Sequence, residues 1–229
     1  MAKPTQPEKP KVLVFAASLR TESLNKKLAA FAAKLAERSG ATVDLASMRD
    51  FDVPLYDGDF EGTAGIPAGA KELQRRLLEC DAFIISSPEY NASMPGTIKN
   101  LIDWTSRFRP QPFDGRHGFL ISASPSMVGG NRGLWALRVP LEHLGARIFP
   151  DMFSLSQAQK AFTGDVLTDA ALQTRLEKSL QAFLSLAEAA KNYPCAKRAW
   201  VEFLGEPPVP GVDRVDAIES PTQTTERPT

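Results

Sequence analysis

Apolar residues occur in two kinds of run along the chain. Short continuous runs such as Lys11-Val-Leu-Val-Phe-Ala16 have the length of a strand and no alternation, which is typical of strands buried on both faces. Longer runs repeat apolar residues every three or four positions, as at Leu24, Leu28 and Leu35, which predicts helices. We expect strands at residues 11–16, 41–46, 81–86, 117–122 and 146–149. We expect helices at residues 23–39, 67–79, 96–108, from the Gly129-Gly130 turn to about 145, and 168–191.

The order of these elements predicts an α/β fold. Each of the five strands is followed by a helix, which is the βαβ rhythm of a parallel sheet with helices on both faces. Right-handed crossovers leave the doubly wound arrangements, in which ligands bind at the carboxyl ends of the strands near the point where strand order reverses. The loops after strands 11–16, 81–86 and 117–122 are therefore the expected site. Residues 51–65 hold one proline and three glycines and are expected to form a long loop.

The two ends of the chain differ in composition from the rest. Residues 1–10 contain three prolines, and residues 205–229 are rich in Pro, Thr and Glu. Both ends are expected to be disordered tails on one domain at residues 11–204.

Charge and composition exclude several classes of protein. The 229 residues carry 27 Lys+Arg against 27 Asp+Glu, with 43% hydrophobic residues. These values exclude a wholly disordered, collagen-like or coiled-coil chain and argue against a nucleic-acid partner that needs a strong positive field. No apolar run approaches the roughly 20 residues that span a bilayer, and the N-terminus lacks the apolar region of a secretory signal. We expect a cytoplasmic protein with no membrane partner.

The two cysteines do not form a metal or disulfide pattern. Cys80 and Cys195 are far apart and have no ligand spacing around them. Cys80, just before the third strand, is expected to be a buried packing residue rather than a redox thiol. No metal site is predicted.

The segment after the first strand carries groups that bind an anion. It supplies hydroxyls at Ser18 and Ser23, an amide at Asn25, a guanidinium at Arg20 and the free N–H groups of a helix start. These donors suit a phosphate. Neither a Walker loop nor a dinucleotide fingerprint occurs, so a mononucleotide phosphate held by hydroxyls fits best. The alternative is that Ser23 is simply a helix N-cap and Arg20 a solvated loop residue.

The segment after the third strand is turn-rich and restricted by two prolines. It reads Ser86-Ser-Pro-Glu-Tyr-Asn-Ala-Ser-Met-Pro-Gly96. Such a loop can present backbone donors and acceptors to a flat heteroaromatic ring, with Tyr90 available for stacking. The alternative is a plain connection whose prolines set the turn before the next helix.

Together these segments resemble the NADPH-dependent FMN reductase family, which includes quinone, chromate and azo-dye reductases. The motifs are Ser18-Leu-Arg-x-x-Ser23-x-Asn25 and Pro88-Glu-Tyr-Asn91-x-Ser93-x-Pro-Gly96-x-x-Lys99-Asn100-x-x-Asp103-Trp104. The resemblance covers about residues 11–190, and the second motif is the more specific. It implies a flavodoxin-like, five-stranded, doubly wound sheet, FMN as cofactor, and NADPH or NADH as electron donor.

The resemblance also assigns residues to parts of the cofactor. The residues that it implies for the FMN phosphate are Ser18, Arg20, Ser23 and Asn25. Those that it implies for the isoalloxazine ring, largely through backbone groups, are Pro88, Glu89, Tyr90 and Asn91. After the fourth strand, residues 122–130 resemble the family's third flavin loop, in which Ser124 is the expected contact, Ser126 is the alternative, and Gly129-Gly130 shapes the floor of the site.

Two positions depart from the family pattern. Ala17 stands where the family commonly has glycine, so its Cβ requires a negative φ or mild strain. Ala92 stands where relatives often carry a larger or different residue, which predicts a more open pocket above the ring and a different acceptor preference.

The function that the resemblance implies is hydride transfer from NAD(P)H to FMN and onward reduction of flavin, quinone or a similar small oxidant. No side chain is expected to act as a nucleophile or general base. One alternative is a flavodoxin-like electron carrier without a nicotinamide site, which the neutral charge and Arg20 disfavour. Another is an interaction protein that keeps the fold without flavin. Four arginines are candidates for contact with the 2′-phosphate of NADPH, namely Arg20, Arg107, Arg109 and Arg132.

Relatives of this kind often form dimers or tetramers. The helix at residues 96–108 carries Leu101, Ile102, Trp104 and Phe108, more apolar surface than one core face needs. We therefore expect a homodimer or homotetramer that forms through this helix.

Overall fold

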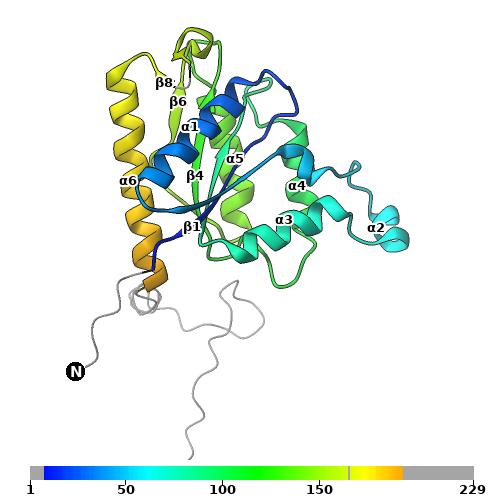
Figure 1. Cartoon of the computed structure of the whole chain (residues 1–229). Helices are drawn as coiled ribbons and strands as arrows, with labels where there is room; N and C mark the ends of the chain where they lie inside the picture. Colours follow the sequence, from blue (N-terminus) through cyan, green and yellow to red (C-terminus); the bar gives the residue numbers. More distant parts are fainter. Residues whose placement is uncertain (1–7, 165, 193–229) are drawn as a thin grey trace, which may run out of the picture. The chain divides into compact units, whose positions relative to one another are not determined.

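A parallel β-sheet forms the centre of the molecule (Figure 1). The structure is a computed structural model that describes residues 8–164 and 166–192. Its strands follow the order β2-β1-β3-β4-β5, which is the flavodoxin-like, doubly wound order. They are β1 (Lys11–Ala16), β2 (Thr42–Ala46), β3 (Ala82–Ser86), β4 (His117–Ala123) and β5 (Arg147–Ile148). The predicted fold class and the five predicted strands are confirmed.

The fifth position of the sheet is an interrupted strand. Both β5 and a further strand, β6 (Phe153–Leu155), pair in parallel with β4. Because β3 occupies the other edge of β4, β5 and β6 share one edge, and Pro150 lies in the gap between them. The sequence pattern predicted only the first piece, since three residues are too few to show a strand period.

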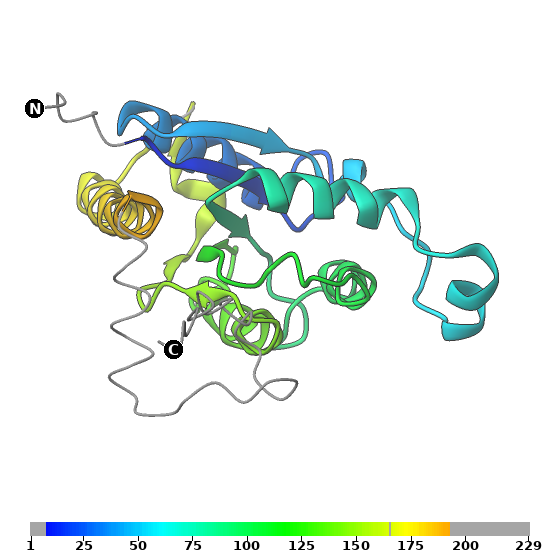
Figure 2. The ribbon, with the colours of Figure 1, turned by 90° about the horizontal axis from the view of Figure 1, so that it is seen from below.

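Helices cover both faces of the sheet (Figure 2). Val12 and Val14 point into a core with α1 (Leu24–Arg38) and α6 (Ala170–Asn192), whereas Leu13 and Phe15 point into a second core on the opposite face. The helices of that second face are α3 (Ala68–Glu79), α4 (Gly96–Thr105) and α5 (Asn131–His143). All residues of β3 and β4 are buried, which explains their continuous apolar sequence.

A projecting segment at residues 52–66, here called the arm, contains a helix where the sequence predicted only a loop. The loop predicted at residues 51–65 is wrong for Phe51, the last residue of the short helix η1 (Met48–Phe51), and for α2 (Gly58–Ala64). The Asp57 side chain caps α2 by accepting from the Asp59 N–H at 2.9 Å, and Gly65 ends it with a φ of 75°. No residue of α2 is buried, and the helix stands apart from the layers in both ribbon views.

The root of the arm covers the face of α4 that we expected to be a dimer contact. The Pro54 carbonyl accepts from Trp104 Nε1 at 2.8 Å, and the Tyr56 ring packs edge-on against the indole at 5.0 Å. Leu101, Ile102 and Trp104 are each at most 2% exposed within one chain. The expectation that these three side chains supply spare apolar surface is therefore wrong.

The remaining elements lie around the edge of the sheet. A short helix, η2 (Ala158–Lys160), and an antiparallel pair, β7 (Phe162–Thr163) with β8 (Val166–Leu167), precede α6 and had no sequence signal. The Glu8 N–H donates to Asn192 Oδ1, and Lys9 pairs with Glu188, so residues 8–10 lie along the end of α6.

Some of the predictions lie outside the described residues. They concern residues 1–7, the domain boundary at 204, the tail at 205–229 and Cys195. None of the helices within the described ranges is long and apolar enough to cross a membrane.

Cys80 is buried where α3 ends. It is 2% exposed, and its thiol donates to the Leu77 carbonyl at 3.4 Å. Burial raises the pKa of the Cys80 thiol to about 11. Because the thiolate is the reactive form, we expect Cys80 in a Cys195→Ser variant to resist iodoacetamide at about pH 8 and to react after unfolding in guanidinium chloride. Mass spectrometry measures the alkylation, and rapid labelling of the native protein would contradict this burial.

Candidate functional site

Three loops leave the carboxyl edge of the sheet next to one another. They follow β1, β3 and β4 and comprise residues 17–23, 87–95 and 124–130. Beyond the strand ends, the Ala17 N–H donates to the Ser86 carbonyl and the Ser87 N–H donates to the Ile121 carbonyl, both at 2.9 Å. These bonds fix the roots of the loops in register. The strand order reverses between β1 and β3, which is where ligands bind in this fold class.

One buried side chain, Asn25, links the three loop roots. Its Nδ2 donates to the Ala123 carbonyl at 2.8 Å, and its Oδ1 accepts from the Ala123 N–H and the Ser86 hydroxyl, each at 3.0 Å. Asn25 lies in the first turn of α1 and is 3% exposed. Its amide is therefore committed chiefly to the ends of β3 and β4, and one of its two amide hydrogens remains for a ligand.

The first turn of α1 contains no acidic side chain to balance the positive end of the helix dipole. Ser23 occupies the N-cap position, but its hydroxyl makes no capping bond, and the first turn contains no acid and two lysines, Lys26 and Lys27. Among the described residues Arg20 has no ion-pair partner, and its side chain lies in an exposed loop. Since helix N-termini normally attract acids, this arrangement suits a bound anion. The alternative that the Ser23 hydroxyl only caps the helix is not supported, because this hydroxyl makes no capping hydrogen bond.

The loop after β1 adopts its conformation without backbone strain. Ala17 is buried and is not among the residues with positive φ, so its Cβ is tolerated. Ser18 is 4% exposed, and its N–H donates to the Ala16 carbonyl at 2.8 Å. Arg49, from η1, supports the loop by donating to the Leu19 carbonyl at 3.2 Å.

The loop after β3 contains a tight type I′ turn. The Tyr90 N–H donates to the Ser93 carbonyl at 2.9 Å, and the Ser93 N–H donates back to the Tyr90 carbonyl at 3.0 Å. Asn91 and Ala92, between them, have φ values of 52° and 61°. A type I′ turn requires positive φ at both central residues, which Asn tolerates and Ala does not favour. The Tyr90 side chain is 49% exposed at this turn, and Pro88 at the loop's start is half-buried.

Replacing Ala92 by glycine is expected to stabilise the protein. Glycine removes the steric cost of a positive φ, so the free energy of unfolding should rise by about 1 kcal/mol. Urea denaturation followed by circular dichroism measures the change. Ala182→Gly, on the exposed face of α6, is the control and should lower the free energy of unfolding by about 1 kcal/mol. A destabilising effect of Ala92→Gly would contradict the turn assignment.

Glu89 directs its carboxylate away from the turn. Oε1 accepts from Arg132 at 2.5 and 2.9 Å, and Oε2 accepts from the Gly133 N–H at 3.1 Å. Burial raises the pKa of Glu89, but the hydrogen bonds from Arg132 and Gly133 outweigh it and lower that pKa below its ordinary value. The side chain is therefore an ionised acceptor at the start of α5.

The loop after β4 starts next to a buried serine, Ser122, that was not among the expected site residues. The Ser124 and Ser126 hydroxyls bond each other at 3.1 Å. Ser122, at the end of β4, has a buried hydroxyl without a hydrogen-bond partner in the described part of the chain. A Cβ at Gly130, whose φ is 86°, would lie 2.0 Å from that oxygen. Sequence reasoning missed Ser122 because it falls inside an apolar strand.

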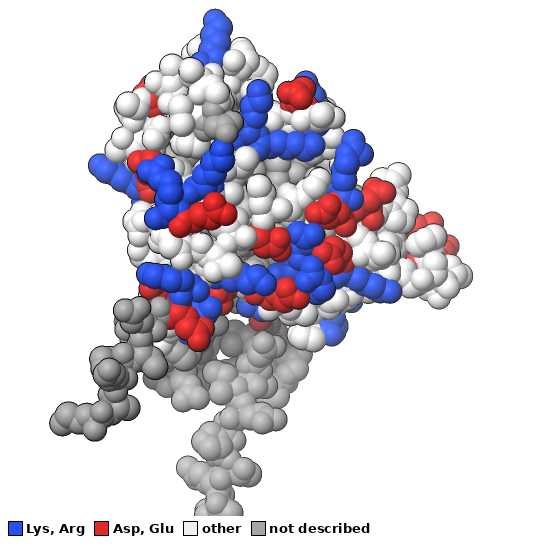
Figure 3. All heavy atoms as spheres, viewed as in Figure 1, with Lys and Arg blue, Asp and Glu red and all other residues white. Residues whose placement is uncertain are grey.

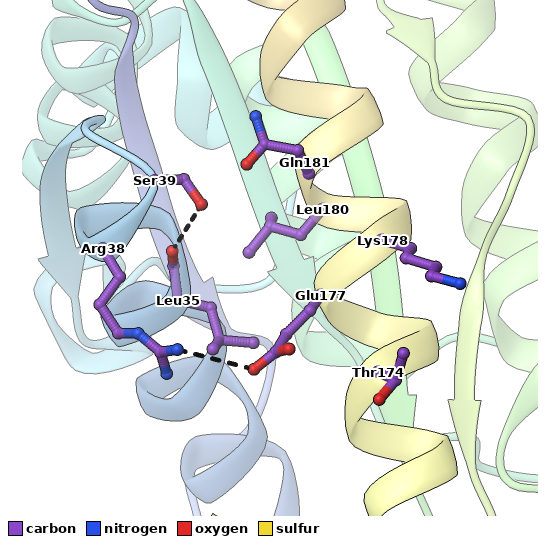
Figure 4. Close-up of a pocket in the computed structure, with 8 residues that line it drawn as sticks. All are labelled: Leu35, Arg38, Ser39, Thr174, Glu177, Lys178, Leu180 and Gln181. Atoms are coloured by element: carbon purple, nitrogen blue, oxygen red, sulfur yellow. Dashed lines mark hydrogen bonds and ion pairs between the residues drawn. The ribbon is translucent and has the colours of Figure 1, made fainter.

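A separate cavity lies at the opposite end of α1 and is not part of this site. Its volume is about 400 Å³, and it opens between the last turns of α1 and the middle of α6 (Figure 4). Arg38 reaches toward Glu177 across it at 3.9 Å, whereas Lys178 points away. Because α1 runs antiparallel to the strands, this cavity lies near their amino ends, away from the three loops.

The described surface has no evident site for a metal. No group of three or more His, Cys, Asp or Glu side chains within residues 8–164 and 166–192 is placed to hold an ion. On the face shown in Figure 3, Lys and Arg are interspersed with Asp and Glu.

Comparison with known proteins identifies the family. The family model for NADPH-dependent FMN reductases matches residues 10–160. The chain belongs to this family. A quinone reductase of Escherichia coli is 37% identical to this reductase over 141 residues, which are 62% of this chain and 74% of the relative. An NAD(P)H-dependent FMN reductase of Pseudomonas aeruginosa is 34% identical over 176 residues, 75% of this chain and 92% of the relative.

Solved structures agree with the fold of this reductase. FerB from Paracoccus denitrificans, a flavoenzyme NAD(P)H:(acceptor) oxidoreductase, aligns with a TM-score of 0.67 at 31% identity and covers 78% of this chain and 97% of its own. RosB, whose structure holds a formylated riboflavin phosphate intermediate, aligns at 0.65 over 96% of both chains; at 16% identity it supports the fold alone.

Family membership confirms that this reductase is an FMN-dependent oxidoreductase with a nicotinamide electron donor. The electron-carrier alternative is not favoured. The donor set of the three loops fits the cofactor, since a helix start with no acidic side chain in its first turn suits its phosphate and an exposed, rigid turn suits a flat ring.

Proposed function

We propose that this reductase passes electrons from NADPH or NADH through FMN to quinones or similar small oxidants. The observation that carries the proposal is that the positive start of α1 and the loop with the exposed type I′ turn lie at the same edge of the sheet, where Asn25 of α1 bonds Ser86 and Ala123 at the ends of β3 and β4. Quinone reductases among the relatives support a quinone as acceptor.

Each loop has its own part in binding. When bound, FMN supplies the hydride chemistry, accepting from a nicotinamide and passing electrons to an acceptor. The proposed phosphate ligands are Ser18, Arg20, Ser23 and the remaining amide hydrogen of Asn25. The proposed ring-lining residues are Pro88, Glu89, Tyr90, Asn91 and, from the third loop, Ser124. They bind and orient, and no side chain is proposed as a nucleophile or base.

The exposed turn is the proposed entrance for the acceptor. Tyr90, Asn91 and Ala92 are all exposed, and Ala92 offers only a methyl group. A flat quinone can therefore approach this side from solvent without displacing a large side chain. The Tyr90 ring is available to stack on it.

Internal contacts occupy three of the four arginine candidates for the 2′-phosphate of NADPH. Arg107 pairs with Glu61, Arg132 with Glu89, and Arg109 donates to the carbonyls of residues 106 and 108. Arg20 is assigned to the FMN phosphate. We therefore assign no arginine to the 2′-phosphate and propose that both nicotinamide donors are used.

We propose a homodimer or homotetramer that acts in the cytoplasm. Apolar side chains exposed on a single chain include Leu55 and Phe60 on the arm and Trp135 and Val139 on α5. Such patches often mark association surfaces. Sedimentation equilibrium at micromolar concentration tests the proposal, and a monomer as the only species overturns it.

The visible absorbance spectrum and an anaerobic NADPH titration test the proposed function. We expect flavin bands in the purified or FMN-reconstituted protein, bleaching by NADPH, and recovery of the bands on adding a quinone. Flavin that NADPH and NADH leave oxidised would favour an electron carrier. Failure to bind excess FMN would refute the cofactor assignment for this chain.

A further inference from the structure

Glu89 acts as a helix cap supplied by a distant loop. The N-cap residue of α5, Gly130, has no side chain, so the first N–H groups of this helix need an acceptor from elsewhere. Glu89 Oε2 provides it by accepting from the Gly133 N–H, 44 residues away in sequence. A carboxylate in this place also interacts favourably with the helix dipole.

The first turn of α5 is shaped to receive the loop after β3. A Cβ at Gly133 would lie 3.1 Å from the Glu89 Cα and Cβ and from the Ser93 carbonyl oxygen. A Cβ at Gly130 would lie 3.7 Å from the Glu89 Cβ. Gly133 thus allows the helix start to lie directly against Glu89 and Ser93, on either side of the tip of the loop, whereas the contact at Gly130 is an ordinary van der Waals distance.

The charge of Glu89 is almost fully enclosed. Its side chain is 8% exposed, while that of its partner Arg132 is 59% exposed. Arg132 donates to one carboxylate oxygen through both Nε and Nη2. A buried carboxylate held by charged and backbone donors resists displacement, because leaving the enclosed Glu89 carboxylate unpaired is costly.

We propose that Glu89 and Arg132 form a positioning pair that holds residues 88–93 in their ring-binding conformation and keeps the charge beside the flavin balanced. The inference rests on the proposed function, in which this loop lines the FMN ring. The turn contains Ala92 at an unfavourable φ, so it needs outside contacts to persist. Without the pair the loop would be ordered only on FMN binding, which weakens affinity.

If the pair balances charge beside the flavin, removing either partner should shift the midpoint potential of bound FMN, which a purely structural role would not do. Reduction adds negative charge to the flavin, so a lone negative charge nearby opposes reduction and a lone positive charge favours it. Arg132→Met leaves Glu89 unpaired and should lower the midpoint potential of bound FMN. Glu89→Gln leaves Arg132 unpaired and should raise it.

Four variants test the pair, with FMN affinity, midpoint potential and apoprotein melting measured for each. Glu89→Gln and Arg132→Met should each weaken FMN binding about tenfold and shift the potential in opposite directions. The double variant should return the potential close to that of the natural chain. Glu142→Gln, which breaks the Arg138–Glu142 pair on the same helix, should change neither quantity.

The outcomes separate this inference from the proposed function. If the natural chain fails to bind FMN, the proposed function fails. If it binds FMN and both single variants match it in affinity and potential, or shift the potential in the same direction, the positioning pair is overturned. If Arg132→Met does not fold, Arg132→Lys replaces it. Lysine keeps the charge but cannot reproduce the two hydrogen bonds of the guanidinium. Weakened FMN binding at an unchanged midpoint potential then supports the positioning pair, and unchanged FMN binding refutes it.

Discussion

Replacing Ser23 by aspartate is expected to weaken FMN binding about a thousandfold while leaving helix α1 at least as stable as in the natural chain. Aspartate is as good an N-cap residue as serine, and its charge interacts favourably with the helix dipole. The same charge would repel the phosphate. Two unit charges about 4 Å apart near a protein surface interact by about 4 kcal/mol, so we expect affinity to fall by about a thousandfold.

Fluorescence quenching of FMN by the apoprotein measures this effect, and two comparisons isolate its cause. Ser23→Ala removes only the hydroxyl and should weaken FMN binding about tenfold. Riboflavin lacks the phosphate, so its weaker affinity should change little in either variant. If Ser23→Asp binds FMN as tightly as the natural chain, the phosphate does not lie at the start of α1.

The parts of the fold that could be predicted are those that local sequence determines. β1, β3 and β4 are buried on both faces, so their apolar runs show them to within two residues. The polar loops that follow them must then meet at one edge of the sheet. The two motifs on those loops were enough to indicate an FMN site.

The parts that were missed depend on contacts between distant segments. α2 has Gly58 and Gly62 in its sequence, which hide its helical pattern, and it forms because Asp57 caps it. Trp104 was expected to supply spare apolar surface, because nothing in the sequence shows that the segment predicted as a loop at residues 51–65 covers it. The direction of the Glu89 carboxylate follows from Gly133, whose importance shows only when α5 lies against the loop.

Asn25 shows the same limit within the site itself. The motif identifies it as a residue of the phosphate loop, but its partners Ser86 and Ala123 lie 61 and 98 residues away in the sequence. No local pattern predicts that pairing. The structure therefore adds a structural role to a residue first identified as a ligand.

Replacing Asn25 by alanine is expected to lower the free energy of unfolding by about 3 kcal/mol, since it leaves the Ala123 N–H, the Ala123 carbonyl and the Ser86 hydroxyl without their buried partner. The three loop roots also lose their common link, so FMN affinity should fall about tenfold or more.

Asn25→Asp keeps both acceptor bonds but turns a carboxylate oxygen toward the Ala123 carbonyl. Only its protonated form can donate there, so its deficit should be smaller at about pH 5 than at about pH 7.5.

Urea denaturation and FMN titration measure both effects, and Asn100→Ala is the matched control. Asn100 makes a similar bridge, from its Nδ2 to the Pro54 carbonyl and from the Tyr56 N–H to its Oδ1, but it holds the arm instead of the loop roots. Its loss should cost about 1 kcal/mol and leave FMN affinity within twofold. If Asn25→Ala costs no more stability than Asn100→Ala, or leaves FMN affinity unchanged, the three loops are held in place by their backbone contacts alone.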